Sequence, residues 1–252
     1  LDGKGRLWVA DFGNSRLRVF DSAGGYLGGW GGKGAGTHAF NNPTAVAISG
    51  DTVYVADTWN GRVEAFSLAG EPKAVVAGLY GPRGVAVGPG GAVFVSDTGN
   101  SRLMIYDANL KEGRAAGSPG SGPEQVSDPV GIVVGPSGAV YVADVNNRRI
   151  QVLDGKGRFV GHWAVPGWTS PGEPFLAVGG NDTIYVSDPA GSAVLALTRN
   201  GKLLRKWDAD DQGRKLVAPT GLALDPGAGV LYVVDKGAST VLKLSLAEKK
   251  AK

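Results

Sequence analysis

The sequence predicts an all-β fold, a six-bladed β-propeller built from four-stranded antiparallel blades. A five-residue pattern occurs six times in the 252 residues: an aliphatic residue, an aromatic residue, Val, a small residue or Val, and Asp. Successive copies are 46, 40, 47, 44 and 47 residues apart, and about 40–45 residues per unit is typical of a propeller blade. The six aspartates are Asp11, Asp57, Asp97, Asp144, Asp188 and Asp235.

Each unit contains segments that suit the four strands of a blade. A proline opens a short apolar run, as in Pro129–Val134, which suits a buried innermost strand. The Tyr-Val-Ala-Asp segment is the second strand, and a segment such as Arg149–Leu153 is the third. The fourth strand often ends in tryptophan, at Trp30, Trp163 and Trp207.

The turn between the second and third strands carries the pattern Asp-x-x-Asn-x-Arg in the first four units, as in Asp144, Asn147 and Arg149. Asp can accept amide hydrogens in the turn, Asn tolerates a left-handed backbone, and Arg can pair with Asp. Because the aspartate recurs once per blade, we expect a structural role for it and no shared metal ion. The fifth and sixth units depart from the pattern after Asp188 and Asp235.

These motifs resemble the NHL-repeat family of six-bladed propellers over nearly the whole chain. The stretch Trp30–Pro43, with its glycines, also resembles the linker between blades in that family. The resemblance implies the fold more firmly than the function, because such propellers include lyases, lactonases, RNA-binding modules and protein-binding sensors.

We expect the propeller to span residues 1–246, followed by a basic tail at 247–252. The strand-opening proline lies 14 to 16 residues before the aspartate in five units, which for Asp11 falls before Leu1. Blade one should therefore lack its inner strand, and the chain should be part of a longer polypeptide. A missing strand would expose unpaired backbone groups.

Composition narrows the classes of partner. The chain has 26 basic and 23 acidic residues, a net charge of +3, and four of the lysines lie in the segment 243–252. The body is therefore close to neutral, which makes nucleic acid an unexpected partner. Cysteine is absent, so there is no disulfide framework. We find no apolar run long enough for a transmembrane helix, and expect no membrane contact in this segment.

The sequence offers no recognisable catalytic set. A catalytic zinc usually takes three protein ligands, and the chain has only His38, His162 and no cysteine. A calcium site would need oxygen ligands at the channel mouth, but the residues after the strand-opening prolines include no carboxylate. We therefore expect no metal, no cofactor and no enzymatic activity.

A binding site is expected on the face shared by the linkers between blades and the turns between second and third strands, because strand polarity brings them to one end of the ring. The candidate residues are Phe12, His38, Phe40, Trp59, Tyr80, Arg83, Trp168, Phe175 and Lys236. Trp59 and Trp168 stand outside the repeat pattern, and both should be solvent-accessible. Trp59 occupies a turn position where other blades carry Gly13, Gly99 or Asn146, residues that accept a positive φ.

The favoured hypothesis is a non-catalytic module that binds a protein, peptide or glycan on this face. RNA binding and a lyase or lactonase activity remain alternatives. The long stretch Asp107–Asp128, rich in Gly, Ser and Pro, is expected to be a flexible loop. The resemblance to the family also implies an extracytoplasmic location.

Overall fold

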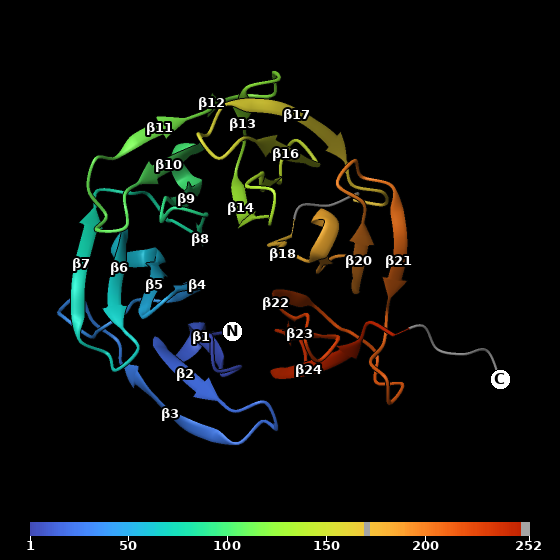
Figure 1. Ribbon diagram of the computed structural model, residues 1–252, viewed down its shortest axis with the longest axis horizontal. Coiled ribbons are helices and arrows are strands. Elements are labelled where there is room, and N and C mark those ends of the chain that lie inside the picture. The colour runs from blue at the N-terminus through green and yellow to red at the C-terminus, as the bar shows by residue number, and fades with distance from the viewer. Residues whose placement is uncertain (169–171, 248–252) are drawn as a thin grey trace.

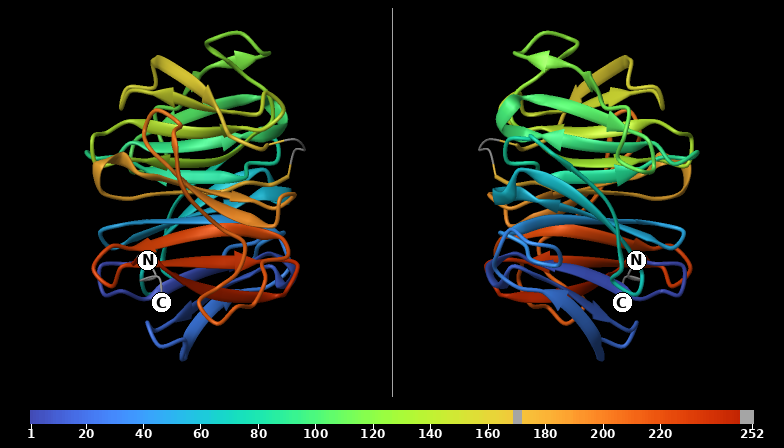
Figure 2. Two further views of the ribbon diagram at one scale, coloured as in Figure 1. Left: turned by 90° about the vertical axis from the view of Figure 1, so that its right-hand side faces the viewer. Right: turned by 90° about the vertical axis from the view of Figure 1, so that its left-hand side faces the viewer.

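In the computed structural model, the described residues are 1–168 and 172–247, and they form six antiparallel β-sheets arranged as a ring. The first strand of a complete blade lies near the axis and the last lies at the rim (Figure 1). Seen from its sides, the ring is a thick body with strands running across it (Figure 2). The predicted six-bladed propeller is confirmed.

The strands follow the predicted order within each blade. Blade one comprises β1 (Leu7–Asp11), β2 (Arg16–Phe20) and β3 (Tyr26–Gly31). Blade two comprises β4 (Pro43–Ser49), β5 (Thr52–Asp57), β6 (Arg62–Ser67) and β7 (Pro72–Ala77). Blade three comprises β8 (Gly84–Val87), β9 (Val93–Asp97), β10 (Arg102–Tyr106) and β11 (Arg114–Ala116).

The second half of the ring repeats this plan. Blade four comprises β14 (Pro129–Val134), β15 (Val140–Asp144), β16 (Arg149–Leu153) and β17 (Phe159–Ala164). Blade five comprises β18 (Leu176–Val178), β19 (Ile184–Asp188), β20 (Ala193–Leu197) and β21 (Leu203–Trp207). Blade six comprises β22 (Pro219–Asp225), β23 (Val230–Asp235) and β24 (Thr240–Ser245).

Short elements occupy the connections. The described part of the chain contains four 3-10 turns, η1 (Phe12–Asn14), η2 (Thr58–Asn60), η3 (Thr98–Asn100) and η4 (Gly180–Asp182). The parallel pair β12 (Ser118–Pro119) and β13 (Gln125–Val126) lies within the stretch predicted to be flexible. No helix among residues 1–168 and 172–247 is long and apolar enough to cross a lipid bilayer.

The first and last sheets each have three strands among the described residues. In blade one, β1 occupies the position of a second strand, and in blade six, β24 occupies the position of a third. Lys243 donates from its ammonium group to the carbonyl oxygen of Ser22, which joins these two blades. The predicted domain limits at 246 and 247 stay a prediction, and residues 248–252 of the predicted tail lie outside the described residues.

The hydrophobic core is divided among the interfaces between blades. The cluster between blades one and two contains Leu17, Phe40 and Phe66, and comparable clusters lie between each following pair up to blades five and six. Burial between sheets is the main favourable contribution to folding. Each blade therefore depends on its neighbour for stability.

Space is tightest where the inner strands approach one another. A Cβ atom added to Gly84 in β8 would lie 2.3 Å from the carbonyl oxygen of Val130 in β14. At Gly221 in β22, the same addition would lie 3.3 Å from the Val234 side chain and would meet no closer atom. The two glycines share one repeat position, but only Gly84 abuts the backbone of the next blade.

We expect Gly84→Ala to lower the free energy of unfolding by about 1–3 kcal/mol, because the backbone of blade four must shift to admit a methyl group. Gly221→Ala is the matched control, and it should change stability by less than half as much. Urea denaturation of both variants measures this. Equal effects would show that the inner strands are not closely packed at Gly84.

Candidate binding face

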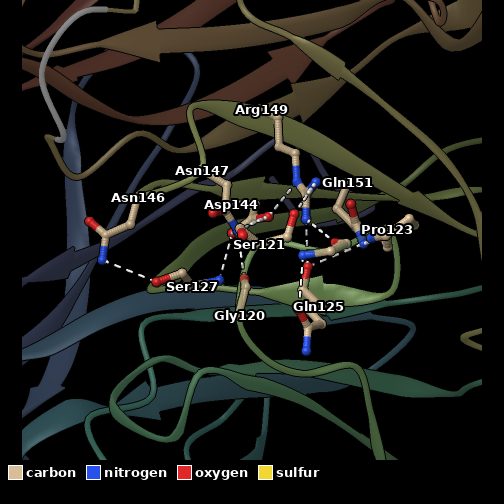
Figure 3. A network of polar contacts seen from close by, with 11 residues as sticks. Gly120, Ser121, Pro123, Gln125, Ser127, Asp144, Asn146, Asn147, Arg149 and Gln151 are labelled. Carbon is tan, nitrogen blue, oxygen red and sulfur yellow. Dashed lines mark hydrogen bonds and ion pairs between the residues drawn. The ribbon is translucent and has the colours of Figure 1, made fainter.

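The repeated aspartate joins the turn of a blade to the linker that enters that blade. In blade four, Asp144 is fully buried and its Oδ1 accepts the backbone N–H of Ser127 at 2.7 Å. Asn147 donates from its side-chain amide to the same carboxylate, and Arg149 donates from Nε at 2.7 Å (Figure 3). We call this arrangement the linker clamp.

Blades two and three repeat the clamp with the same geometry. Asp57 accepts the backbone N–H of Asn41, and Asp97 accepts that of Tyr80, each at 2.7 Å. In blade six, Asp235 accepts the backbone N–H groups of Val217 and Ala218 without help from an arginine. These contacts give the aspartates a structural role.

Blades one and five depart from this pattern. Asp188 accepts a hydrogen bond from the backbone N–H of Gly191, within its own turn. Asp11 pairs with Asn14 and Arg16, and its side chain is 18% exposed where Asp57, Asp97 and Asp144 are fully buried.

The arginine of the clamp also fixes the path of the linker. Arg149 donates to the carbonyl oxygens of Ser121, Gly122 and Gln125 (Figure 3). Arg62 makes the equivalent bonds to Ala35, Gly36 and Ala39. The second half of the stretch predicted to be flexible is therefore held in a defined conformation. That prediction was wrong because it weighed the composition of the loop and not the donors that the next blade supplies.

A titratable carboxyl lies beside the clamp of blade two. Glu64, two residues after Arg62, is 5% exposed, and its Oε1 lies 2.8 Å from Nη2 of Arg62 without hydrogen-bond geometry. Burial raises the pKa of Glu64 to about 7, although the Arg62 charge opposes this; the charges of Asp57 and His38 act more weakly. The corresponding residue of blade four is Gln151, whose side chain is a neutral amide.

Three aromatic side chains are exposed on the turns and linkers of blades one to three. Phe12 is 37%, Trp59 57% and Tyr80 64% exposed. Asn42 donates from its side chain to the carbonyl of Phe12, and the neighbouring Asn41 accepts the backbone N–H of Trp59. Tyr80 accepts the backbone N–H of Gly99 in η3. We call Phe12, Trp59 and Tyr80 the aromatic arc.

A chain of charges continues from the aromatic arc. The Lys236 ammonium lies 5.7 Å from the ring centre of Phe12 and 3.5 Å from Oε2 of Glu173. Glu173 also forms an ion pair with Arg83. Burial raises the pKa of nearby Asp128, the Arg83 charge opposes this rise, and the Glu173 charge adds to it. Phe12 thus joins the aromatic arc to the charged groups of Lys236, Glu173 and Arg83, and we treat these residues as one patch.

The structure brings some of the predicted site residues together and separates others. Phe12, Trp59, Tyr80, Arg83 and Lys236 belong to the patch just described. Phe175, at the start of blade five, is partly buried against the core between blades four and five. Glu173 and Asp128 were missed, although each lies immediately before a strand-opening proline and could have been found there.

Three predicted residues lie elsewhere. Phe40 is fully buried against Phe66, because the linker folds its ring into the core between blades one and two. His38 contacts the carbonyl oxygen of Gly70, in the turn at the opposite end of β6 from η2. Trp168 is only 9% exposed and packs in the core with Val145 and Val165, so the prediction that it is accessible was wrong.

The backbone of Trp59 also differs from the prediction. Trp59 lies in the 3-10 turn η2, and the left-handed residue that follows it is Gly61, with φ 61°. The equivalent left-handed positions are Ser15, Ser101 and Arg148. The backbone of Trp59 is therefore unstrained, because the positive φ of this turn falls on Gly61 and not on Trp59.

Comparison with known sequences identifies the repeat. The family model described as "NHL repeat" matches residues 40–66, 79–106 and 127–153. NHL-repeat-containing protein 4 of Homo sapiens is 37% identical over 101 residues, which cover 38% of this chain and 77% of that protein. E3 ubiquitin-protein ligase NHLRC1 of Rattus norvegicus is 33% identical over 111 residues, which cover 43% of this chain and 28% of that ligase. The chain thus spans little more than a quarter of the ligase.

Solved structures share the fold at low sequence identity. A nidogen/laminin complex contains a chain with a TM-score of 0.75 and 17% identity, covering 96% of this chain and 89% of that one. A streptogramin B lyase gives a TM-score of 0.67 with 13% identity, over 98% of this chain and 82% of that one.

These comparisons correct one prediction. The expectation that the chain is not an enzyme was wrong, because a sequence relative is named as an E3 ubiquitin-protein ligase and lyases are among the proteins with this fold. The absence of a recognised catalytic motif in the sequence did not justify that expectation.

We expect Asp97→Ala to lower the free energy of unfolding by about 3 kcal/mol, because it removes a buried carboxylate and leaves Arg102 and the Tyr80 amide without their partner. Asp11→Ala is the matched control at the same repeat position, and it should cost about 1 kcal/mol or less. Chemical denaturation compares the two. A loss for Asp97→Ala no larger than that for Asp11→Ala would contradict the structural role of the clamp.

Glu64→Gln should remove a pH-dependent loss of folding stability. The pKa of Glu64 is raised on folding, so the native state binds the proton more tightly and the ionised form destabilises it. The wild-type protein should lose up to about 3 kcal/mol relative to Glu64→Gln as pH rises from about 4.5 to above 7. Unfolding free energies of both proteins across this range measure the difference. A difference independent of pH would contradict the raised pKa.

Proposed function

The chain belongs to the NHL-repeat family, and on that premise we propose that it binds a partner protein or peptide through its turn-and-linker face. The observation that carries the proposal is the aromatic arc of Phe12, Trp59 and Tyr80, exposed beside the charges of Lys236, Glu173 and Arg83. Large aromatic side chains and arginine are typical of energetically important sites in protein interfaces.

The scaffold beneath the arc supports a binding role. The backbone of Trp59 is held by Asn41, and that of Tyr80 by the buried carboxylate of Asp97. Aromatic side chains on a fixed backbone lose little conformational entropy when a partner covers them. A partner can therefore gain binding energy from these rings without first ordering the loops.

The charges beside the aromatic arc favour a protein as the binding partner over a nucleic acid. Arg83 and Lys236 both pair with the carboxylate of Glu173, so the patch carries both signs. A phosphate backbone needs cations that are free to displace its counterions. The name of the rat relative is compatible with a protein partner, because a ubiquitin ligase must recognise the protein that it modifies.

We expect Trp59→Ala to weaken peptides selected on the wild-type protein from a phage-displayed random library by about 30-fold, since an anchoring tryptophan contributes about 2 kcal/mol or more. Tyr80→Ala should weaken the same peptides. Isothermal titration calorimetry gives the affinities, and the melting temperatures of both variants should stay close to that of wild type because the side chains are exposed.

Tyr26→Ala is the matched control, because Tyr26 is 58% exposed but lies on the outer strand β3. It should leave peptide binding unchanged. Selected peptides that bind Trp59→Ala and Tyr80→Ala as tightly as wild type would refute the proposed face. Tight binding of single-stranded RNA with a steep salt dependence, or of a glycan in place of any peptide, would refute the proposed class of partner.

A further inference from the structure

Glu64 is buried beside Arg62, the arginine that fixes the linker between blades one and two. We call residues 32–42 of that linker the first linker. A guanidinium group carries five N–H donors, one on Nε and two on each Nη. Arg62 donates from Nε to Asp57 and from Nη1 to the carbonyl oxygen of Ala35. The remaining nitrogen, Nη2, is the one that lies next to Glu64.

Nη2 of Arg62 has no hydrogen left for Glu64. It donates to the carbonyl oxygens of Gly36 and Ala39, at 3.1 and 2.7 Å. Oε1 of Glu64 lies 2.8 Å from the same nitrogen, yet it is buried without a hydrogen-bond partner. Two N–H groups cannot serve three acceptors with good geometry. The carbonyl oxygens of the first linker and the Glu64 carboxyl therefore compete for one nitrogen.

The protonation of Glu64 decides how strong this competition is. Asp57 is fully buried, and Arg62 supplies the positive charge that balances it. With a proton on Glu64, the group contains one carboxylate for one guanidinium. Without that proton, a second negative charge is buried, and an uncompensated buried charge is costly. Ionised Glu64 should therefore draw Nη2 away from the linker.

The charges that act on Glu64 come from its own strand, a neighbouring strand and the first linker. In decreasing order of effect they belong to Arg62 on β6, Asp57 at the end of β5, and His38. The residues paired with Glu64 on β5 and β7 are valines, which carry no charge. Burial outweighs the Arg62 charge and raises the pKa of Glu64 to about 7, so its proton is exchanged near neutral pH.

Blade four has the same arrangement without a second carboxylate. Nη2 of Arg149 donates to the carbonyl oxygens of Gly122 and Gln125, as Nη2 of Arg62 does in blade two (Figure 3). Gln151 occupies the position of Glu64, and its amide nitrogen donates to the carbonyl oxygens of Pro123 and Gln125. Gln151 thus strengthens the hold on its linker, where ionised Glu64 would weaken it.

We propose that the protonation state of Glu64 controls whether Arg62 holds the first linker. With Glu64 protonated, Nη2 stays on the carbonyl oxygens of Gly36 and Ala39, and the linker is closed. When Glu64 gives up its proton to solvent, Nη2 turns to the carboxylate, and both carbonyl oxygens are released to water. We call this the Glu64 switch.

The first linker continues to the aromatic arc. Asn41 accepts the backbone N–H of Trp59, and Asn42 donates from its side chain to the carbonyl oxygen of Phe12. An open linker holds these two residues less firmly, so a partner must order them when it binds. A rise in pH should then weaken binding at this face. This consequence rests on the proposed function, whereas the Glu64 switch itself does not.

Amide hydrogen exchange measured by NMR tests the switch, with each rate divided by that of an unstructured peptide at the same pH. The amides of Gly34 and Phe40 report on the first linker, because both form hydrogen bonds within it. In wild type, the opening equilibrium should rise by up to about 50-fold from about pH 5 to about pH 8, since the open state loses the Glu64 proton more readily. Glu64→Gln should keep these amides protected throughout.

Blade four supplies the matched control. The amides of Gly120 and Gln125, hydrogen-bonded within its linker, should show no such change in wild type. Gln151→Glu should make them pH-dependent, and starting its series at about pH 5 keeps the carboxyl protonated and the variant folded. His38→Gln should retain the wild-type behaviour of the first linker, which separates Glu64 from the titration of a histidine.

Two results in the first linker would overturn the switch. One is a wild-type opening equilibrium that does not change with pH, and the other is the same pH dependence in Glu64→Gln as in wild type. A linker of blade four that stays insensitive to pH in Gln151→Glu would also contradict it, because the count of donors is the same in both blades.

Peptides selected on wild type at about pH 6 test the consequence for binding. Their affinity, measured by isothermal titration calorimetry, should fall toward about pH 8 for wild type and stay constant for Glu64→Gln. An equal fall in both proteins would show that the switch does not regulate the face. Failure to select any peptide would count against the proposed function alone, since the exchange experiment decides the switch without a ligand.

Discussion

The buried carboxylate at the end of the second strand is the interaction on which the turn-and-linker face depends. Asp57, Asp97 and Asp144 each accept an amide of the incoming linker together with side chains of the following turn. A linker and a turn that share one carboxylate are held in a fixed relative position. Tyr80 illustrates the result, because its own amide is the one bound by Asp97 and its ring is left exposed.

Repetition explains why so much of the fold could be predicted from the sequence. Six copies of the strand-ending aspartate located the second strands, and the prolines and tryptophans located the first and fourth. The Asp-x-x-Asn-x-Arg pattern was also interpreted correctly as a structural turn, since hydrogen-bond chemistry at fixed spacing is local. Non-repeating positions had no such support.

Most of the wrong predictions fall in the linkers, because the linkers do not repeat from blade to blade as the strands do. Phe40 and Trp168 lie in linkers whose paths depend on contacts with neighbouring blades, so their burial could not be judged from residue type. The stretch Asp107–Asp128 contains flexible residue types, but Arg149 and Gln151 of the following blade bind its carbonyl oxygens. Glu173 joins Arg83 and Lys236 only after blades three, five and six are brought around the axis.

The differences between blade interfaces have a consequence for folding. Similar repeats in one chain can dock in the wrong order, and a tandem array is prone to such misassembly. Trp30 packs where blade two offers Gly70, whereas blade three has Leu110 at the corresponding place. Docking blade one directly onto blade three would press an indole against a leucine, while the smaller Val76 of blade two suits that leucine. Unequal side-chain sizes across successive interfaces thus disfavour a ring in which blade one docks directly onto blade three.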